Sequence, residues 1–307
     1  MKKLITILFS AIALLSCNSN ATKPSQETKS EANTAKDFDL EGHRGARGLY
    51  PENSIMGFVE ATDIGVNTLE MDICVTKDKK LVVSHDPWMS SEICRTPDGK
   101  DISEKDQTKY AIYQMTYDQV RKFDCGLKPH PRFPDQYKAP AIKPLLKYVV
   151  EVVETYTTAH YIKPVQYNIE TKSLPEWDDA FEPEPEEFCK LLYDELKKLG
   201  ILDRVIIQSF DVRTLQIFKR DHPVIRLALL VENDYGFDMN IAELGFDPDI
   251  YSPDYHLVDG KLVQTCHQRK IKVLPWTVDT EEAMDAMLSL GVDGLITDFP
   301  DLAITLK

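Results

Sequence analysis

From residue 38 onward, short apolar runs alternate along the chain with segments of helical periodicity. This alternation is typical of βα units, in which each strand is followed by a helix that covers a parallel sheet. The predicted strands are Phe38–Gly42, Asn67–Val75, Val165–Thr171, Arg204–Gln208, Ile225–Val231, Asp249–Ser252, Ile271–Thr277 and Gly294–Ile296. The predicted helices include Ser54–Ile64 with Asn53 as its N-cap, Pro185–Leu199, Asp211–Arg220 and Thr280–Leu290. Strands in this number and order favour a closed (β/α)8 TIM barrel, an α/β fold.

Two further features support a barrel over an open sheet. No GxGxxG turn follows a predicted strand, which removes the main support for a dinucleotide-binding fold. Residues 88–140 interrupt the βα repeat with prolines, tyrosines and charges, so we expect a small insertion there, after the run that ends at His85. Insertions at this position of a barrel lie over the active-site face.

The charge balance narrows the class of partner. The 307 residues are 43% hydrophobic and 28% charged, and the formal net charge is −14. A surface this acidic repels nucleic acid and anionic lipid head groups at long range, so we expect neither as a bulk partner. A small anionic substrate would need a local positive centre, supplied by a metal ion or by a few basic residues.

Two predicted strands carry acidic residues on a face that should point into the barrel. Because side chains alternate along a strand, Glu70 and Asp72 share one face while their apolar neighbours share the other. Two buried carboxylates so close together need a cation or a shared proton. Glu170 shares a strand face with Lys172 and would complete an oxygen site for one divalent ion, Ca²⁺ or Mg²⁺. Lys172 is then placed to hold a phosphate.

Two histidines and a tryptophan lie at the ends of predicted strands. His43 follows the first strand within Gly42-His43-Arg44-Gly45, and His85 ends a β-branched run. A single histidine is usually structural, but both of these end strands near the carboxylates. Trp276 ends the seventh strand, where it is either a core aromatic or a wall against the organic part of a substrate.

Short motifs in order along the chain resemble the signature of glycerophosphodiester phosphodiesterases. They are His43-Arg44-Gly45, Pro51-Glu52-Asn53-Ser54, Glu70-x-Asp72, Ser84-His85-Asp86, Ile169-Glu170-x-Lys172, Gln208-Ser209-Phe210 and the run Asp293–Pro300. Each motif alone is weak, but together they are highly specific and span residues 38–301. The resemblance implies a (β/α)8 barrel with a small insertion domain, and hydrolysis of glycerophosphodiesters to an alcohol and sn-glycerol 3-phosphate.

The resemblance also assigns roles to the residues already singled out. It implies one divalent metal ion held by Glu70, Asp72 and Glu170, with Arg44 and Lys172 on the phosphate. Two histidines would transfer protons, and we assign His43 as the general base and His85 as the general acid. Trp276 would contact the substrate.

Three other functions compete with this one. A phosphatidylinositol-type phospholipase C also uses two histidines on a related barrel, but the Glu/Asp/Glu set favours the metal-dependent class. A non-catalytic surface lipoprotein that binds phosphodiesters would need the basic residues but not both histidines and three acids. A purely structural lipoprotein would need none of these residues.

The N-terminus predicts export. Lys2 and Lys3 precede the apolar stretch Leu4–Leu15, which is too short to span a bilayer, and Leu14-Leu15-Ser16-Cys17 resembles the lipobox of bacterial lipoproteins. Residues 1–17 would then be a lipoprotein signal peptide, residues 18–37 a disordered tether and residues 38–307 the barrel. We expect a membrane-anchored lipoprotein of the bacterial cell envelope, lipidated at Cys17. The alternative is an ordinary signal peptide with an incidental Cys17.

Five cysteines follow the predicted signal peptide. None has the spacing of a zinc site, and an exported protein can form disulfides. Cys94 and Cys125 lie in the same irregular segment, where a bridge and two free thiols are equally compatible with the sequence. Cys74, Cys189 and Cys266 are predicted to be small core residues.

Overall fold

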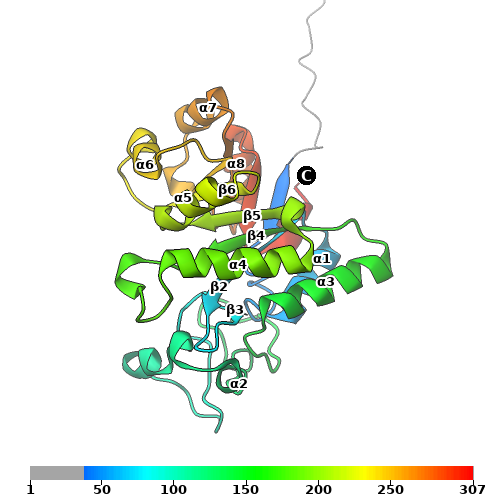
Figure 1. Cartoon of the computed structure of the whole chain (residues 1–307). Helices are drawn as coiled ribbons and strands as arrows, with labels where there is room; N and C mark the ends of the chain where they lie inside the picture. Colours follow the sequence, from blue (N-terminus) through cyan, green and yellow to red (C-terminus); the bar gives the residue numbers. More distant parts are fainter. Residues whose placement is uncertain (1–37, 307) are drawn as a thin grey trace, which may run out of the picture. The chain divides into compact units, whose positions relative to one another are not determined.

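The computed structural model describes residues 38–306, so Cys17, the predicted signal peptide and the predicted tether lie outside the described residues. Parallel strands form a sheet in the order β8-β7-β6-β5-β4-β2-β1-β9 (Figure 1). Their bounds are β1 Asp39–Gly42, β2 Thr68–Val75, β4 Gln166–Thr171, β5 Val205–Ser209, β6 Arg226–Val231, β7 Ile250–Pro253, β8 Lys272–Val273 and β9 Gly294–Thr297. Each predicted strand is present, and the predicted barrel is confirmed.

The two ends of this strand order, β8 and β9, meet through backbone and side-chain hydrogen bonds. The Asp293 amide donates to the Val273 carbonyl at 2.9 Å, and the Ile296 amide donates to the Pro275 carbonyl at 3.0 Å. The Asp293 carboxylate also accepts from the Val273 amide at 2.8 Å. The sheet is therefore a nearly closed barrel.

Strand β8 is shorter than the predicted strand Ile271–Thr277. Proline has no amide hydrogen to donate, so the regular ladder ends before Pro275. The extended chain nevertheless continues beside β7, because the amides of Leu274 and Trp276 donate to the carbonyls of Tyr251 and Pro253.

Helices follow most of the strands and pack against the barrel. They are α1 Ile55–Ile64, α3 Leu146–His160, α4 Pro185–Leu199, α5 Val212–Asp221, α6 Phe237–Leu244, α7 Gly260–Gln268, α8 Glu281–Leu290 and α9 Pro300–Ile304. Helix α4 has the predicted bounds and ends at Gly200, which adopts the left-handed conformation with φ 72°.

The N-cap predicted for α1 is wrong by one residue. Ser54 is the N-cap, and its hydroxyl accepts from the Gly57 amide at 3.1 Å. Asn53 has a positive φ of 53°, and its side-chain amide donates instead to Asp72. The Asn53 side chain therefore binds a distant residue rather than capping α1, the role that its local helix-capping preference predicts.

The predicted division of β2 into two faces is present in the structure. Leu69, Met71 and Ile73 are fully buried in the core cluster between the strands and the helices. Glu70 and Asp72 lie on the opposite face, inside the barrel, and are 1% exposed. The alternation of side chains along one strand thus separates the hydrophobic core from the polar interior.

The segment between β3 (Leu81–Val83) and α3 does not follow the βα repeat, as predicted for residues 88–140. Strand β3 pairs antiparallel with β2, and the segment after it contains short 3₁₀ turns and the helix α2 (Tyr117–Val120). A disulfide joins Cys94 to Cys125, with sulfur atoms 2.14 Å apart. Figure 1 shows this insertion below the barrel, next to β2 and β3.

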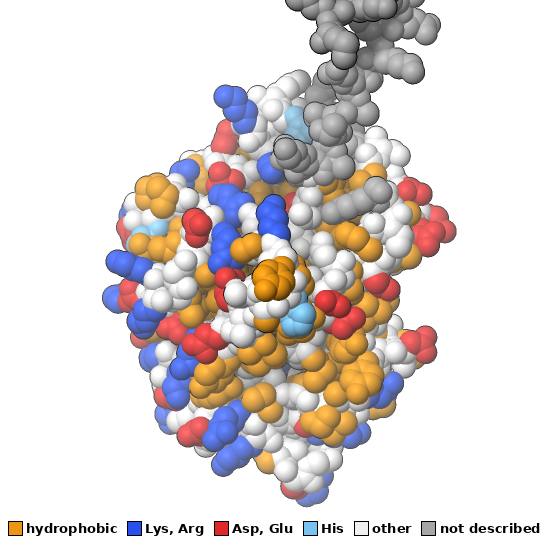
Figure 2. All heavy atoms as spheres, turned by 90° about the vertical axis from the view of Figure 1, so that its right-hand side faces the viewer, with side chains coloured by type: hydrophobic (Ala, Val, Ile, Leu, Met, Phe, Trp, Pro, Cys, Tyr) orange, Lys and Arg blue, Asp and Glu red, His pale blue; other side chains and the backbone are white. Residues whose placement is uncertain are grey.

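The remaining cysteines and the visible surface complete the description. Cys74, Cys189 and Cys266 are free and buried, as predicted. Within residues 38–306, no helix is long and apolar enough to cross a membrane. Figure 2 shows acidic and basic side chains interspersed with hydrophobic ones on one face of the molecule.

Candidate active site

A tight turn after β1 places two of the predicted site residues at the mouth of the barrel. A side chain at Gly42 would place its Cβ 2.2 Å from the Gly45 carbonyl oxygen, and Gly45 itself has a φ of 91°. Both positions therefore require glycine. The turn directs His43 and Arg44 into a pocket at the carboxyl ends of the strands, the position typical of barrel active sites.

Three carboxylates meet beside this pocket, and two of them, Glu70 and Glu170, line it. Strands β2 and β4 are paired so that Asp72 lies opposite Glu170, while Glu70 lies two residues before Asp72 on the same face. One oxygen from each of Glu70, Asp72 and Glu170 lies within 4.8 Å of the others, and all three residues are buried. The alternation of side chains along each strand, together with the register between β2 and β4, explains why residues from separate strands form one cluster.

Hydrogen bonds from neighbouring residues orient two of the carboxylates. Glu70 accepts from the Arg44 amide and from the Gln208 side-chain amide, both at 2.8 Å. Asp72 Oδ2 accepts from Asn53 Nδ2 at 2.8 Å, whereas the buried Asp72 Oδ1 has no hydrogen-bond partner among the described residues. A buried carboxylate oxygen without a donor is suited to a cation.

The charges of the cluster are unbalanced. Burial raises the pKa of Glu70 well above its ordinary value, and the nearby Asp72 carboxylate acts in the same direction. Burial also raises the pKa of Glu170 to about 7, although Lys172 opposes this effect. Burial would raise the pKa of Asp72 as well, but Arg44, His85 and Lys172 together outweigh it, so this pKa lies below its ordinary value. A divalent cation would favour the ionised form of all three groups.

Lys172 lies beside the carboxylates, as its strand face predicts. Its ammonium group is 2.7 Å from Glu170 Oε1 and 3.9 Å from Asp72 Oδ1, and the residue is buried. Lys172 is not among the residues that line the pocket, whereas Arg44 is. In this structure, therefore, Lys172 contacts the carboxylates rather than the open space of the pocket.

His43 is held by a residue that the sequence analysis did not assign to the site. Its Nδ1 atom is 2.8 Å from Asp298 Oδ1, and Arg47 binds the same carboxylate through Nε at 2.7 Å and Nη2 at 2.6 Å. Burial would raise the pKa of Asp298, but His43 and Arg47 together lower it below its ordinary value. The ionised Asp298 accepts a hydrogen bond from Nδ1–H, which leaves the unprotonated Nε2 of a neutral His43 able to accept a proton.

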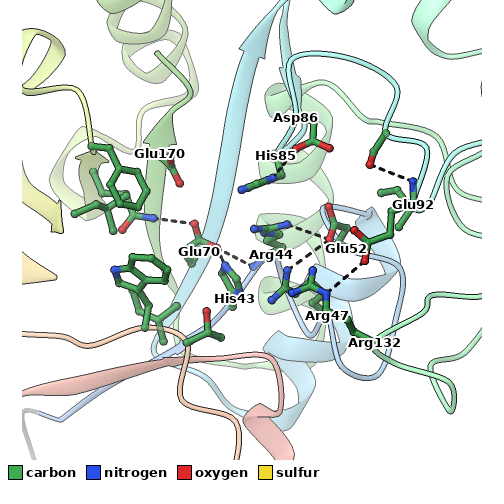
Figure 3. A pocket seen from close by; sticks show the side chains of 18 residues that line it. His43, Arg44, Arg47, Glu52, Glu70, His85, Asp86, Glu92, Arg132 and Glu170 are labelled. Carbon is green, nitrogen blue, oxygen red and sulfur yellow. Dashed lines mark hydrogen bonds and ion pairs between the residues drawn. The ribbon is translucent and has the colours of Figure 1, made fainter. Parts of the chain in front are cut away.

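His85 lies on the other side of the pocket, close to the insertion (Figure 3). Its Nδ1 atom is 2.9 Å from Asp86 Oδ1, and its side chain is 35% exposed, compared with 11% for His43. Burial lowers the pKa of His43 to about 4, and nearby Arg47 acts in the same direction. Burial also lowers the pKa of His85, and there Arg44 adds to the effect. Each imidazole thus has one nitrogen bound to a carboxylate.

The pocket has a volume of about 280 Å³ and two chemically different walls. The apolar wall consists of Phe210, Leu230, Trp276 and Ile296. Trp276 is partly buried, donates from its indole nitrogen to the Ser252 carbonyl at 2.8 Å, and meets Phe210 edge-on. It therefore packs against neighbouring residues and also faces the pocket, so both predicted roles are compatible with its position. The other wall, the charged wall, is mostly charged or polar and includes Ile93.

Three residues that orient the site were missed by sequence reasoning, although all lie in the motifs. Asn53, Gln208 and Asp298 contact Asp72, Glu70 and His43, respectively. The only available signal was the polar residue itself within a motif. Their partners lie 19, 138 and 255 residues away, so spacing along the chain does not reveal them.

The fold and the pocket define a (β/α)8-barrel enzyme with a buried carboxylate cluster between two histidines. Residues 43–302 match the model of the glycerophosphoryl diester phosphodiesterase family. This chain therefore belongs to that family, and the predicted family and enzyme class, hydrolysis of glycerophosphodiesters, are confirmed.

Individual relatives agree over most of their length. A glycerophosphodiester phosphodiesterase from Caldanaerobacter subterraneus subsp. tengcongensis is 31% identical, over 86% of this chain and 95% of the relative. One from Bacillus altitudinis is also 31% identical, over 86% of this chain and 96% of the relative.

Solved structures of the same fold include one from Silicibacter pomeroyi DSS-3 that bears the same family name. It has a TM-score of 0.76 and 27% identity, and the match covers 88% of this chain and 94% of that one. A phosphodiesterase from Oleispira antarctica, solved with the product sn-glycerol-3-phosphate, has a TM-score of 0.68 and 20% identity, over 87% of this chain and 95% of that one.

Proposed function

We propose that this chain hydrolyses glycerophosphodiesters to an alcohol and sn-glycerol 3-phosphate, with a divalent metal ion and two histidines. One observation carries the proposal: His43 and His85 line the same pocket as Glu70 and Glu170 of the carboxylate cluster, and each histidine binds a carboxylate through Nδ1. This arrangement leaves two Nε2 atoms for proton transfer beside a site suited to a cation. The family membership supports the choice of substrate class.

The metal ligands would be Glu70, Asp72 and Glu170. All are oxygen donors, which Ca²⁺ and Mg²⁺ prefer. Asp72 Oδ1, which accepts no hydrogen bond from the described residues, suits a cation held between the three carboxylates. When bound, the ion would supply a Lewis acid that neutralises charge on the phosphoryl oxygens. Arg44, whose guanidinium lines the pocket, would add a fixed positive charge.

The two histidines would divide the proton transfers between them. His43 is the more buried, and its Nε2 would accept the proton of the attacking hydroxyl, either water or the substrate's own glycerol 2-hydroxyl. Attack by the 2-hydroxyl would form a cyclic phosphodiester, which a water molecule would then open to glycerol 3-phosphate. His85 lies on the more exposed, insertion side and would donate the proton of its Nε2 to the departing alcohol. The apolar wall around Trp276 would face the carbon skeleton of glycerol.

The phosphate contact predicted for Lys172 remains part of the proposal. Its ammonium group lies against Glu170 and Asp72, where it would balance their charge before the ion binds. Substrate binding would then add an anionic partner on the pocket side.

The proposal is tested by turnover. Purified protein with added Ca²⁺ or Mg²⁺ should release glycerol 3-phosphate from sn-glycero-3-phosphocholine in a coupled assay. Binding without turnover would instead support a non-catalytic lipoprotein. Turnover that persists in excess chelator, with no metal in the protein, would support the phospholipase C-type alternative, which does not require the carboxylate cluster.

The location of the protein is a separate proposal. We propose that it is exported and anchored to a membrane of the bacterial cell envelope through a lipid on Cys17. The support is the short apolar stretch, the lipobox-like sequence and the polar segment that follows it.

A further inference from the structure

The charged wall of the pocket contains one carboxylate that the proposed mechanism does not use. The carboxylates that line the pocket are Glu52, Glu70, Asp86, Glu92 and Glu170. Glu70 and Glu170 belong to the proposed metal site. Glu52 accepts from the Arg44 guanidinium at 3.1 Å, and Asp86 accepts from His85. Glu92, which belongs to the insertion, remains.

Glu92 is only weakly neutralised. Its Oε1 atom lies 3.3 Å from Arg132 Nε, but the Arg132 side chain is 56% exposed, so water screens this pair (Figure 3). Within 4.0 Å, its other basic partner among the described residues is His130, whose Nε2 lies 3.7 Å away. Burial lowers the pKa of His130, which disfavours the charged imidazolium that would offset the carboxylate.

The insertion holds Glu92 in place from both sides. Cys94, two residues later, is bonded to Cys125. Before Glu92, the Ser91 carbonyl accepts from the Lys128 ammonium. His130 packs against Phe133 with ring centres 4.7 Å apart, and Phe133 packs in turn against Phe299 of the barrel. The disulfide, the Lys128 hydrogen bond and the aromatic contacts therefore fix the backbone that carries the Glu92 carboxylate.

The position of Glu92 relates it to one half of the substrate. Figure 3 shows it on the same side of the pocket as His85, which would protonate the departing alcohol, whereas the apolar wall comes from residues in or just after β5, β6, β8 and β9. An alcohol next to His85 would therefore extend toward Glu92. A positive group on that alcohol would meet a carboxylate without a buried counter-ion, and a neutral alcohol would gain nothing from it.

We propose that Glu92 selects glycerophosphodiesters whose alcohol carries an ammonium group, and that Arg132 opposes this selection. The inference rests on the proposed function and adds the charge of the preferred leaving alcohol. Glu92 and Arg132 do not touch the reacting atoms, so they determine specificity rather than catalysis. Their effects on the ratio of two substrates should have opposite signs.

The test compares two substrates that give the same product. The kcat/KM for sn-glycero-3-phosphocholine is divided by that for sn-glycero-3-phosphoglycerol, with glycerol 3-phosphate measured in both assays. The wild-type ratio should exceed one. Glu92→Gln should lower the ratio about three- to fivefold, the usual value of a partly exposed ion pair, and Arg132→Gln should raise it about twofold.

Glu104→Gln is the matched control, because Glu104 is an exposed residue of the same insertion that does not line the pocket. It should leave the ratio unchanged. The inference is overturned if Glu92→Gln leaves the ratio within 1.5-fold of wild type. It is also overturned if Glu92→Gln and Arg132→Gln move the ratio in the same direction. If the wild type releases no glycerol 3-phosphate from either substrate, the proposed function fails and the inference fails with it.

Discussion

The Nδ1 atom of His43 lies 2.8 Å from Oδ1 of Asp298, a residue 255 positions later in the chain. The contact follows from the barrel, because β1 and β9 pair in register with Gly42 opposite Thr297. His43 and Asp298 are the first residues after these two strands. Closure of the sheet therefore brings together an imidazole and the carboxylate that determines which of its nitrogens carries the proton.

Asp298→Asn should lower kcat by about 10²-fold while KM changes little. An amide can replace the shape of the carboxylate but not its charge, so it no longer stabilises the protonated ring. The measurement is steady-state kinetics with glycerophosphocholine. Asp301→Asn, an exposed change three residues later, is the control and should have no effect. A normal kcat in folded Asp298→Asn would show that Asp298 only supports the fold.

Removing either imidazole should be more damaging than altering its partner. We expect His43→Ala and His85→Ala each to lower kcat by about 10²–10⁴-fold, the usual contribution of general acid–base catalysis. Exposed His256, near the end of β7, offers a matched His256→Ala control that should stay active. Near-wild-type turnover by either folded site mutant would refute its assigned role.

Chelation should abolish activity, and Ca²⁺ or Mg²⁺ should restore it. Glu70→Gln and Asp72→Asn should weaken metal binding more than they change the fold, because each removes a charge from a buried cluster that needs a cation. Metal titration followed by thermal unfolding gives a readout that does not depend on catalysis, since a ligand that binds only the folded state raises Tm. A Tm unaffected by metal in the wild type would contradict the proposed site.

Lys172→Ala should lower kcat/KM, because it removes a cation next to Glu170 and Asp72. Loss of that charge should also destabilise the metal-free protein. Lys172→Arg should rescue only in part, since a planar guanidinium does not replace a compact ammonium. The measurements are kinetics on glycerophosphocholine and thermal unfolding without metal. A kcat/KM within about twofold of wild type in Lys172→Ala would exclude a role in the reaction.

The residues that could be predicted from the sequence are those whose position depends on strand periodicity. Glu70, Asp72 and Glu170 lie on regular strands, so their alternation with apolar neighbours indicates the inward face. The same reasoning places Lys172 beside Glu170. The end of the barrel at which these residues meet can also be predicted, because parallel strands all have their carboxyl ends at the same end of the barrel.

The residues that could not be predicted depend on contacts between distant segments. Asn53 is of a residue type that favours helix N-caps, but its side-chain amide donates to Asp72 instead. Glu92 lies in an insertion without strand or helix periodicity, so no pattern indicates which of its side chains face the pocket. The Cys94–Cys125 bond likewise depends on how that insertion folds.

Replacement of Cys17 tests the proposed location. Cys17→Ser should release the protein into the soluble fraction or leave it as an uncleaved precursor, because the acyl chains would have no attachment point. Fractionation and N-terminal sequencing make the measurement. Soluble wild-type protein whose mature N-terminus is not residue 17 would contradict the anchor.

Strand β1 starts at Asp39, and its carboxyl end leads into the turn that carries His43. Any segment before Asp39 is therefore joined to the barrel at the end opposite the pocket, the upper end in Figure 1. A lipid anchor on that segment, as proposed for Cys17, would be attached away from the mouth of the pocket, which leaves the mouth accessible to substrates dissolved in water.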